Sequence, residues 1–585
     1  MKKSFNLLIL IILLFLTFQN CISQNVNNTS LKLSGDADKY HINTLGKNVF
    51  LFDPQMNMKD IQSLIDTIYS KQASKGSEFN ENRFALLFKP GKYNLDIKVG
   101  YYMHIIGLGE NPEDVVITGE VRSKSTNKNG NVLTNFWREA ENLTVIPTVE
   151  PANVWAVSQA AALRRIYIKG DLQLHDKGYA SGGFLADSKI DGTVMAGGQQ
   201  QWFSRNTEFQ KWTGGAWNIM FLGVLGSPAS DWPKGPITTL EKTPAIREKP
   251  YLIIKEGRFY IKIPDIKLNS SGPSWLNGYK DKKTVSLEKF YIVKQGCIAD
   301  SINLALQKGK NLLFTPGIYK LDKSIKVTRP GTIIIGLGMA TLLPSSDNLV
   351  MDVSDINDVT ICGLMFEAGK NNSETLLQVG IPDSHKNHAS SPTLLSDLFF
   401  RVGGATESSA TSCLTINSNN VCVDHVWLWR ADHGNGVGWN KNKCANGLIV
   451  NGDRVLIYGL FNEHFQEYQT LWNGNHGRLY FYQSEMPYDP SNIDAWKHDG
   501  IGGYASYKVS DKVTSHEAWG LGIYCYFPSL PVIVNNAIEA PQKIEKDIHH
   551  KMIYWLNGNK ESKILNIIND KGGSVTFSNK SSRID

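Results

Sequence analysis

The sequence predicts an all-β protein built from two tandem right-handed parallel β-helix domains in one chain. Three observations support this fold class. One block of sequence occurs twice in the same order, which indicates an internal duplication. Short apolar segments, broken by Gly, Asn and Asp, recur at intervals of roughly 20 to 30 residues, as stacked β-helix coils would give. A chain of 585 residues is also too long for a single hydrophobic core.

The duplication is clearest in two short motifs. Residues 86–93 (LLFKPGKY) recur as residues 312–319 (LLFTPGIY), at an offset of 226 residues. Residues 105–109 (IIGLG) recur as residues 334–338, at an offset of 229 residues. Because the two offsets differ by only one short insertion, the two blocks are interpreted as copies of one structural unit.

The elements of each copy follow in order. Each begins with a helix-like stretch, residues 60–70 and residues 300–308, followed by an apolar strand, a Pro-Gly turn and an Ile-rich strand. Each helix is expected to cap the open end of its β-helix, because uncovered strand edges are prone to pairing with other chains. Later apolar segments, such as residues 447–452 and 455–460, are predicted as further coil strands. A β-sandwich is the competing fold, but it would favour hairpin turns and shorter spacing.

These patterns divide the chain into four predicted segments. They are a signal peptide (1–24), a first β-helix domain (25–240), a connection (241–288) and a second β-helix domain with a C-terminal extension (289–585). The connection is rich in Pro, Lys, Ser and Gly, and it contains a predicted hairpin over residues 251–255 and 258–263.

The N-terminus has the pattern of a secretion signal. Lys2 and Lys3 precede an apolar run over residues 7–16, which is too short to span a bilayer as a helix. Cys21 follows and could be lipidated; the alternative is ordinary cleavage near Ser23. The protein is therefore expected to be exported, to an extracellular, periplasmic or lipid-anchored location. No other segment of the sequence is apolar enough to predict a transmembrane helix.

Composition argues against several classes of partner. The net charge of +6 comes from 61 basic and 55 acidic residues without a long basic run, so nucleic acid is not an expected partner. A strongly acidic polysaccharide also fits poorly. The 14 tryptophans suit a surface that stacks on sugar rings, although most tryptophans pack in cores. The six cysteines after Cys21 form no CxxC pair, so they are predicted to be buried thiols, with room for one disulfide. A monomer is expected.

Residues suited to acid–base chemistry are densest between Trp427 and Trp519, where carboxylates, histidines and aromatic residues alternate. Hydrolysis of a glycosidic bond needs a carboxylic acid, a positioned water or nucleophile, and aromatic platforms for the sugar. Two neighbouring His–Asp pairs in this segment could suggest a metal. Adjacent residues of a strand point to opposite faces, however, so neither a metal nor another cofactor is expected.

Longer motifs carry a family resemblance. They are WAVSQ (155–159), ASGGF (180–184), GQQQW (198–202), WRADHG (429–434), NGD (451–453), GLFNEHF (459–465), WNG (472–474) and QSEMPYDP (483–490). Through them the chain resembles bacterial members of glycoside hydrolase family 55, over about residues 48–527. The resemblance implies a laminarinase-type β-1,3-glucanase with a substrate cleft between its two β-helices. It further implies an inverting, exo-acting enzyme that releases glucose.

The resemblance also implies the catalytic residues. Glu485 corresponds to the general acid, and Glu463 lies about one coil earlier. The 22-residue spacing would place both on one face, where a neighbouring carboxylate raises the pKa of the acid. Gln159 and Ser181 are implied to hold the attacking water. Neither is a base, so its proton would leave by another route, through Glu463; alternatively, these residues only make structural hydrogen bonds.

Substrate contacts are predicted for eight further residues: Gln200, Trp429, Asp432, His433, Trp439, Trp472, Asn473 and Tyr488. Three rival functions stay open. A polysaccharide lyase would need a Lys or Arg base with clustered Asp ligands, which the sequence does not suggest. A non-catalytic glycan-binding protein is compatible with the fold, because a fold does not determine chemistry. A related hydrolase could also prefer another glycan.

Overall fold

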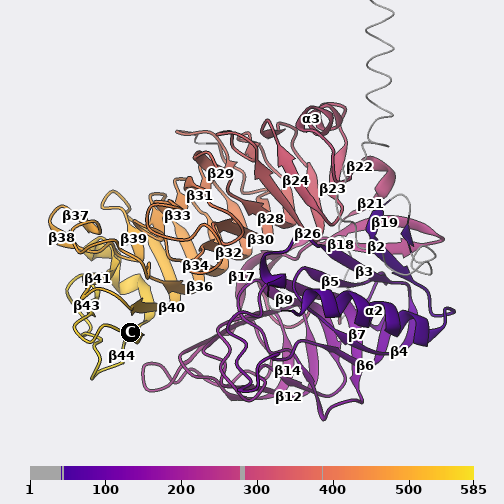
Figure 1. Ribbon diagram of the computed structural model, residues 1–585, viewed down its shortest axis with the longest axis horizontal. Coiled ribbons are helices and arrows are strands. Elements are labelled where there is room, and N and C mark those ends of the chain that lie inside the picture. The colour runs from indigo at the N-terminus through magenta and orange to yellow at the C-terminus, as the bar shows by residue number, and fades with distance from the viewer. Residues whose placement is uncertain (1–40, 43–44, 75, 277–282, 385) are drawn as a thin grey trace, which may run out of the picture.

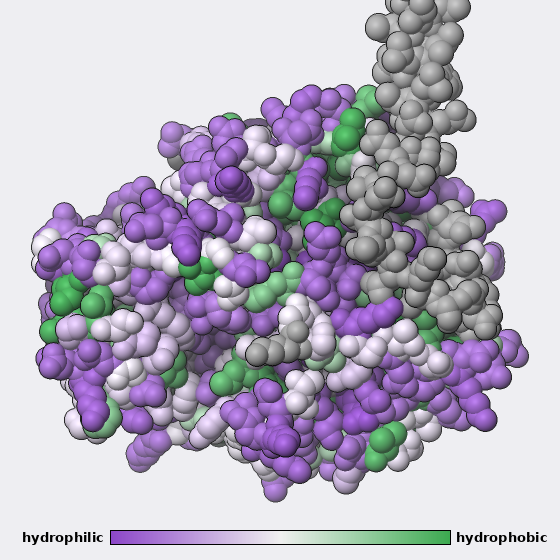
Figure 2. Space-filling model, in the orientation of Figure 1, coloured by the Kyte–Doolittle hydropathy of each residue, from purple (hydrophilic) through white to green (hydrophobic). Residues whose placement is uncertain are grey.

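The computed structural model describes residues 41–42, 45–74, 76–276, 283–384 and 386–585. The predicted signal peptide and Cys21 lie outside the described residues. Figure 1 shows two elongated β-structures lying side by side, the first in indigo to magenta and the second in rose to yellow. Within the described ranges, no helix is long and apolar enough to cross a membrane. On the face shown in Figure 2, hydrophilic residues dominate and apolar residues appear in small groups.

The first β-helix is one 16-stranded sheet that winds on itself. Apart from β1, its named strands pair in parallel, and its main path runs β2-β3-β5-β7-β9-β11-β13-β15-β16. The strands are β1 (His41–Ile42), β2 (Gly46–Phe52), β3 (Phe84–Phe88), β4 (Gly91–Lys98), β5 (Met103–Gly107), β6 (Val115–Arg122), β7 (Arg138–Pro147), β8 (Ala152–Val154), β9 (Ala161–Ile168), β10 (Asp171–Gln173), β11 (Phe184–Ala186), β12 (Lys189–Gly197), β13 (Gln201–Arg205), β14 (Glu208–Gly214), β15 (Asn218–Leu222) and β16 (Ile237–Leu240).

The second β-helix has two parallel sheets, here named by the length of their strands. The long-strand sheet contains β22 (Phe290–Val293), β23 (Asn311–Phe314), β24 (Ile318–Leu321), β26 (Ile333–Pro344), β28 (Thr360–Glu367), β30 (Thr393–Val402), β32 (Val421–Arg430), β34 (Leu456–Glu463), β36 (Gly477–Glu485), β40 (His516–Phe527), β42 (Ile548–Gly558) and the antiparallel β44 (Ser581–Ile584). The short-strand sheet contains β25 (Ile325–Val327), β27 (Met351–Val353), β29 (Ser373–Val379), β31 (Ala410–Ile416), β33 (Asn446–Val450), β35 (Thr470–Trp472), β39 (Tyr507–Val509), β41 (Ile533–Glu539) and β43 (Lys563–Ile568). A small hairpin joins β37 (Lys497–His498) and β38 (Ile501–Gly502).

The duplication predicted from the sequence is confirmed in detail by two tyrosines. Tyr93 donates its hydroxyl to the carbonyl oxygens of Lys89 and Phe52, at 2.9 and 3.1 Å. Tyr319 makes the same two bonds, to Thr315 and Val293, at 2.7 and 2.8 Å. Each hydroxyl therefore ties the Pro-Gly turn to the preceding strand at the equivalent point of its copy.

The two predicted helices are confirmed, with slightly different bounds. Helix α2 (Met58–Gln72) extends two residues further at each end than predicted, because the Asn57 side chain caps its first turn. Its apolar side joins the core of the first β-helix, and α3 (Ala299–Gln307) joins the core of the second. The described residues also form the short 3-10 helices η3 (Ser77–Phe79), η4 (Pro112–Asp114), η5 (Leu287–Lys289) and η6 (Gln542–Asp547).

The coils vary in length more than the sequence predicted. Residues in register on β34 and β36 are 22 positions apart, as in the pair Leu456 and Arg478. Between β32 and β34 the interval is 34 positions, as in Cys422 and Leu456. The extra residues form loops between strands, and these loops leave the register of the strands unchanged. The six described cysteines are buried free thiols, so none forms a disulfide in this structure.

A line of left-handed residues bends the long strands of the second β-helix. Seven residues in neighbouring register adopt φ between 49° and 72°: Gly363, Asp397, His425, Gly459, Phe481, Gly520 and His550. A single left-handed residue turns a strand sharply. Each long strand therefore supplies two faces of the β-helix, one before this corner and one after it.

The predicted hairpin in the connection is confirmed as β18 (Tyr251–Lys255) and β19 (Arg258–Ile263), which β21 (Lys283–Ser286) extends to three strands. A second pair joins β17 (Thr243–Arg247) to β20 (Ile266–Ser270). Apolar residues of β18 and β19 share one buried cluster with residues from both β-helices. The connection is therefore wedged between the two β-helices rather than exposed as a loose linker.

Buried ion pairs join the two β-helices. Arg164 of β9 binds both oxygens of Asp397 at 2.8 Å and one oxygen of Asp424 at 2.7 Å. Arg205 of β13 binds Asp424 on the second β-helix and Glu248 in the connection. These carboxylates and guanidinium groups are almost inaccessible to solvent. Paired and hydrogen-bonded on all sides, they hold the two β-helices and the connection in one relative position.

We predict that Arg164→Ala lowers the free energy of unfolding by about 3–5 kcal/mol, because Asp397 and Asp424 each lose one of their buried cations and keep only Lys249 and Arg205 respectively. Urea unfolding followed by tryptophan fluorescence measures this change. Lys323→Ala, which removes a fully exposed ion pair with Asp300, is the control and should leave the unfolding midpoint unchanged. Equal midpoints for Arg164→Ala and the parent would show that the network does not stabilise the docked state.

Candidate active site

Two glutamates lie side by side where strands of the second β-helix end. Glu463 is the last residue of β34 and Glu485 the last of β36, and the two are in register. Parallel neighbours in a sheet are about 4.8 Å apart, so both side chains leave the same face after the corner. The predicted stacking of these two residues on successive coils is therefore seen in the structure.

The Glu463 carboxylate is held by two hydrogen bonds, one from each β-helix. Its Oε2 accepts a hydrogen bond from the indole Nε1 of Trp427 at 2.8 Å. Its Oε1 accepts a hydrogen bond from Gln159 Nε2, also at 2.8 Å, across a separation of 304 residues. With 3% of its surface exposed, Glu463 forms the floor where the first β-helix meets the second.

Glu485 is more open. Its Oε1 accepts a hydrogen bond from Gln483 Nε2 at 3.3 Å, and its Oε2 accepts one from the Tyr488 hydroxyl. Tyr488 in turn packs on His464, with 4.3 Å between ring centroids. The carboxyl group is thus oriented by neighbours on its own β-helix, and it is only half-buried.

Both glutamate side chains have a raised pKa, so they keep their proton to a higher pH than an ordinary glutamate does. Burial raises the pKa of Glu463 to about 7; the nearby charge of Asp432 adds to this, while the hydrogen bonds from Trp427 and Gln159 oppose it. Burial also raises the pKa of Glu485, well above its usual value, and the charges of Glu463 and Asp432 raise it further. Near neutral pH the pair therefore holds a proton that sits on Glu485, with Glu463 able to gain or lose one.

Gln159 and Ser181 come from the facing edge of the first β-helix, just before β9 and β11. Ser181 Oγ lies 3.0 Å from Ser158 Oγ and 3.3 Å from Gln159 Oε1. Because Gln159 also binds Glu463, a continuous hydrogen-bonded path runs from Ser181 to Glu463. The structure thus brings together all four predicted catalytic residues.

Asp432 and His433 lie beside the glutamates, in the loop after β32. His433 bonds Asp432 through Nδ1 at 2.8 Å and Glu78 of the first β-helix through Nε2 at 2.7 Å. Burial alone would lower the pKa of His433, but the two carboxylates outweigh it and raise that pKa to about 10. Asp432 also lies 4.0 Å from His464 Nε2. This charged group forms a second bridge between the two β-helices.

The predicted sugar-stacking role of Trp429 is not compatible with its position. Trp429 is 1% exposed and stacks on Trp427, with 5.1 Å between ring centroids. Both rings pack on Trp137 and Phe136 of the first β-helix. No ring face of Trp429 is therefore free for a sugar. The cluster instead packs beneath the floor of the site.

Trp472 and Asn473 were predicted as substrate contacts, and this prediction is wrong for the site around the glutamates. Trp472 is fully buried in the core of the second β-helix, against His516. Asn473 donates to Asn451 in a stack of asparagines at the turn before β36. That turn lies at the opposite end of β36 from Glu485, before the corner at Phe481. In the sequence, the WNG motif of this turn was interpreted as a binding motif because turns and binding motifs both contain Asn and Gly.

The remaining predicted contacts lie nearer the glutamates. Gln200 is half-buried at the first β-helix edge, where its backbone nitrogen binds Ala180 beside Ser181. Trp439 is partly buried beside Arg430, whose guanidinium lies 5.6 Å from the ring centre and binds Asp489. These two residues stay predictions as substrate contacts.

Sequence reasoning missed an aromatic row beyond Glu485. Tyr524 of β40 is in register with Glu485, and Tyr554 of β42 is in register with Tyr524. Trp217 of the first β-helix stacks on Tyr554, with 4.2 Å between ring centroids. The only signal in the sequence was the alternation of aromatic residues along β40 and β42, which buried core strands share. Trp427 was also missed as the hydrogen-bond donor to Glu463.

Comparisons with known proteins identify the family of this chain. The family model of the LAM55 pectate lyase-like domain matches residues 290–485. An exo-beta-1,3-glucanase of Streptomyces sp. (strain SirexAA-E / ActE) is 44% identical over 532 residues, which are 90% of this chain and 87% of that protein. The chain belongs to glycoside hydrolase family 55.

Solved structures of this family have the same fold. The structure of sacteLam55A from Streptomyces sp. SirexAA-E aligns with a TM-score of 0.89 at 43% identity, covering 92% of this chain and 98% of that one. A variant of sacteLam55A in complex with glucose aligns with the same TM-score at 42% identity and the same coverage. The predicted fold class and the family resemblance are therefore confirmed, and this family 55 member is a glycoside hydrolase.

The raised pKa of Glu463 has a cost in stability that can be measured. Below pH 4 the side chain is protonated in both folded and unfolded chains, so its contribution is zero. As the pH rises above 4, the unfolded chain ionises first and is favoured, until the folded side chain also ionises near pH 7. We predict that Glu463→Gln is more stable than the parent by about 1–3 kcal/mol at pH 8 and unchanged at pH 4.

Thermal melting across this pH range measures the difference between the two proteins. Gln159 can turn its amide to accept from the new side chain, so the hydrogen bond need not be lost. Glu467→Gln, an exposed change on the same coil, is the control and should match the parent at every pH. A stability difference for Glu463→Gln that does not grow with pH would contradict the assigned pKa shift.

Proposed function

We propose that this protein is an inverting, exo-acting β-1,3-glucanase that releases glucose from laminarin-like glucan. The observation that carries the proposal is the Gln159–Glu463 hydrogen bond, which places residues from two β-helices around one pair of carboxyl groups. The curated relative at 44% identity, named an exo-beta-1,3-glucanase, supports the linkage and the exo action.

Glu485 acts as the general acid. Its raised pKa keeps the carboxyl group protonated at neutral pH, and its half-buried position leaves it accessible to a glycosidic oxygen. The proton moves from Glu485 to that oxygen as the bond between the oxygen and the anomeric carbon breaks. Tyr488 and Gln483 donate hydrogen bonds to the carboxylate that results.

Water attacks from the opposite wall of the cleft. Gln159 and Ser181 belong to the first β-helix, whereas Glu485 belongs to the second, so a water bound by this pair approaches the anomeric carbon opposite the departing oxygen. The water loses one proton as it bonds to carbon. Glu463, reached from Ser181 through Gln159, has a pKa of about 7 and accepts that proton.

The spacing of the two glutamates makes the stereochemical outcome an open test. Strand neighbours at about 4.8 Å bring their carboxyl groups closer than the ~6.5–9.5 Å of a usual inverting pair. Retaining enzymes have a separation of about 5–5.5 Å, with one carboxylate as nucleophile. Here both Glu463 oxygens are engaged by Trp427 and Gln159, so this carboxylate is not free to attack carbon. Inversion by water is therefore the proposal.

The aromatic row of Tyr524, Tyr554 and Trp217 lies on the leaving-group side of Glu485. Tyr524 is 1% exposed and packs beneath the row, whereas Tyr554 and Trp217 are partly exposed. Aromatic faces bind the C–H surfaces of pyranose rings, so Tyr554 and Trp217 suit the part of the glucan chain that departs. The N-terminal signal pattern supports export, which gives the enzyme access to polymeric glucan, and we propose that the protein acts outside the cytoplasm as a monomer.

We predict that Glu485→Gln lowers kcat on laminarin by about 10²- to 10⁴-fold, the usual contribution of a general acid. In the parent, kcat/KM should fall as the pH rises through the pKa of Glu485, because the acid form is lost. Released sugars are followed by chromatography on laminarin and on a panel of other glycans. Glu467→Gln is the control and should retain the parent rate.

Each outcome of this experiment is informative. Glucose from laminarin, lost in Glu485→Gln, supports the linkage, the exo action and the acid together. Longer oligosaccharides in place of glucose would overturn exo action alone. Cleavage of another glycan but not laminarin would overturn the substrate, and binding without any turnover would favour a glycan-binding protein.

We predict that the first glucose released from a β-linked chain is the α-anomer. Attack by a water held opposite Glu485 inverts the anomeric carbon, whereas a nucleophilic carboxylate would return the β-anomer after two inversions. Proton NMR during the first minutes of reaction, before mutarotation, distinguishes the two anomeric protons. Initial β-glucose would assign the nucleophile to Glu463 and remove the water-binding role of Gln159 and Ser181.

A further inference from the structure

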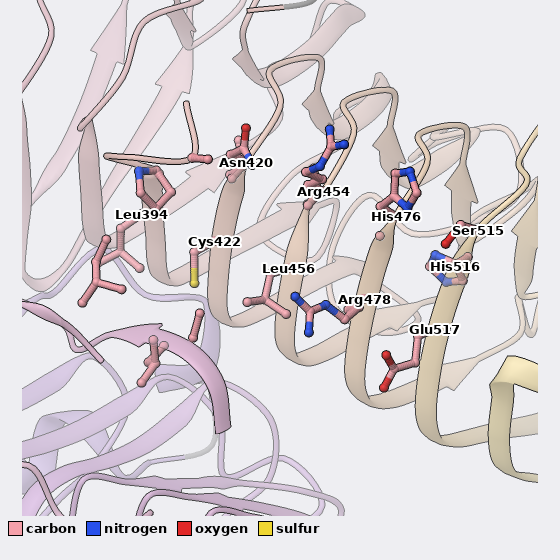
Figure 3. Close-up of a pocket in the computed structure, with 18 of the residues that line it drawn as sticks. Leu394, Asn420, Cys422, Arg454, Leu456, His476, Arg478, Ser515, His516 and Glu517 are labelled. Carbon is pink, nitrogen blue, oxygen red and sulfur yellow. The ribbon is translucent and has the colours of Figure 1, made fainter. Parts of the chain in front are cut away.

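A groove lies at the beginnings of long strands of the second β-helix, whereas the glutamates lie at the ends of two of these strands. It has a volume of about 720 Å³ and runs across the beginnings of five long strands, from β30 to β40. One wall is β17 of the connection, and the far end is formed by Asp547 and His549 before and within β42. Figure 3 shows the groove with its side chains projecting from successive strands. None of its lining residues belongs to the site around Glu485.

The floor of this groove is one register row. Leu394, Cys422, Leu456, Arg478 and Glu517 occupy the same position on five neighbouring strands. Adjacent strands are about 4.8 Å apart, so the row is about 19 Å long. A second row, Asn420, Arg454, His476 and Ser515, lines the rim two residues earlier on the same coils (Figure 3). The groove is therefore long enough for several sugar units and changes character along its length, from apolar to polar.

The polar groups of the groove include both donors and acceptors. Arg454 and Arg478 form no ion pair with any described residue, so their guanidinium groups keep donors for a ligand. Glu517 is oriented by Trp519 Nε1 at 2.8 Å and by the Tyr480 hydroxyl at 3.2 Å, both on one carboxylate oxygen. Its other oxygen is left to accept. Asp547 adds a second carboxylate at the same end.

This mixture of charges favours a neutral ligand over an anionic one. A carboxylated or sulfated chain along the row would meet Glu517 and Asp547, which repel it. Sugar hydroxyls, in contrast, accept from guanidinium groups and donate to carboxylates within the same short distance. Leu456 is partly exposed above the buried Leu394 and Cys422, and it can take the C–H face of a pyranose ring.

Arg247 adds a further reason to regard the groove as a built site. It is 3% exposed in the wall facing this row, and its Nη1 binds Asp358 at 2.7 Å. Its Nε and Nη2 are buried without a hydrogen-bond partner among the described residues. A buried, partly unsatisfied guanidinium is costly for folding alone, so its retention at this wall points to a role beyond packing.

We propose that this groove is a second, non-catalytic binding site for a neutral β-glucan chain. The proposal rests on the proposed function for the identity of the glucan, and it goes beyond that function by assigning a site remote from the hydrolysis. Sites made mainly of solvent-facing hydrogen bonds bind weakly one at a time. Combined with the active site on one polymer or particle, a weak site still raises apparent affinity through effective concentration.

The test compares a polymer with a short substrate. Arg478→Ala and Arg454→Ala remove donors from the floor and the rim, and exposed Arg454 can be changed without disturbing the core. Each should raise KM for long β-1,3-glucan by about five-fold, which is roughly the net contribution of one hydrogen bond, without changing kcat. Hydrolysis of a β-1,3-linked trisaccharide, too short to reach from the acids to the groove, should be unchanged. Arg258→Ala, an exposed change on the connection hairpin, is the matched control.

A second measurement separates binding from turnover. In a Glu485→Gln background, the full chain is incubated with insoluble neutral β-1,3-glucan and the bound fraction is measured at low and high salt. Binding that falls in both groove variants and is insensitive to salt supports the proposal. Unchanged binding and KM in both variants overturn it. Binding only to a carboxymethylated glucan, lost at high salt, also overturns it, because the ligand would then be anionic.

The outcome is distinguishable from a failure of the proposed function. If the parent hydrolyses no β-1,3-glucan, the proposed reaction fails. Loss of insoluble-glucan binding in the groove variants would still support the second site. Conversely, full hydrolysis of glucan with no effect of Arg478→Ala or Arg454→Ala would keep the reaction and remove the groove.

Discussion

The contact between the two β-helices is the constraint on which the active site depends. Gln159 and Glu463 are separated by 304 residues, yet a 2.8 Å hydrogen bond between them requires the two β-helices to dock in one position. Arg164 and Arg205 provide that position, because each places a buried cation against carboxylates of the facing β-helix. Aromatic rings pack on the same contact and exclude water. The active site can therefore form only when the two β-helices are docked in this position.

Parallel stacking then determines the chemistry of the acids. Burial raises the pKa of both glutamates, and coils in register bring Glu463 close enough for its charge to raise the pKa of Glu485 further. The same stacking that stabilises the β-helix thus creates an arrangement that is unfavourable for two ionised carboxyl groups. The pair of carboxyl groups that supplies the acid therefore also lowers the stability of the fold.

Much of the fold could be predicted because it is periodic. The repeated LLF and IIGLG motifs indicated duplication, and the 22-residue interval placed Glu463 beside Glu485. What could not be predicted depends on contacts between distant segments. Whether Trp429 faces solvent or Trp137 is decided by the first β-helix, which sequence spacing does not reveal. Trp472 lies on the inner face of its coil, and a three-residue strand is too short for alternation to show this.

Glu463, Glu485, Tyr524 and Tyr554 occupy one position on four consecutive strands, and this ordering bears on how such enzymes can diverge. Neighbouring strands of the sheet are about 4.8 Å apart, so these four positions are evenly spaced along the β-helix. Insertion or deletion of a whole coil would lengthen or shorten the row by one such spacing without moving the acids relative to each other. Insertions within a coil form loops at the rim and leave the spacing of the strands unchanged. Changes in reach are therefore expected in discrete steps, while changes in selectivity accumulate in the loops.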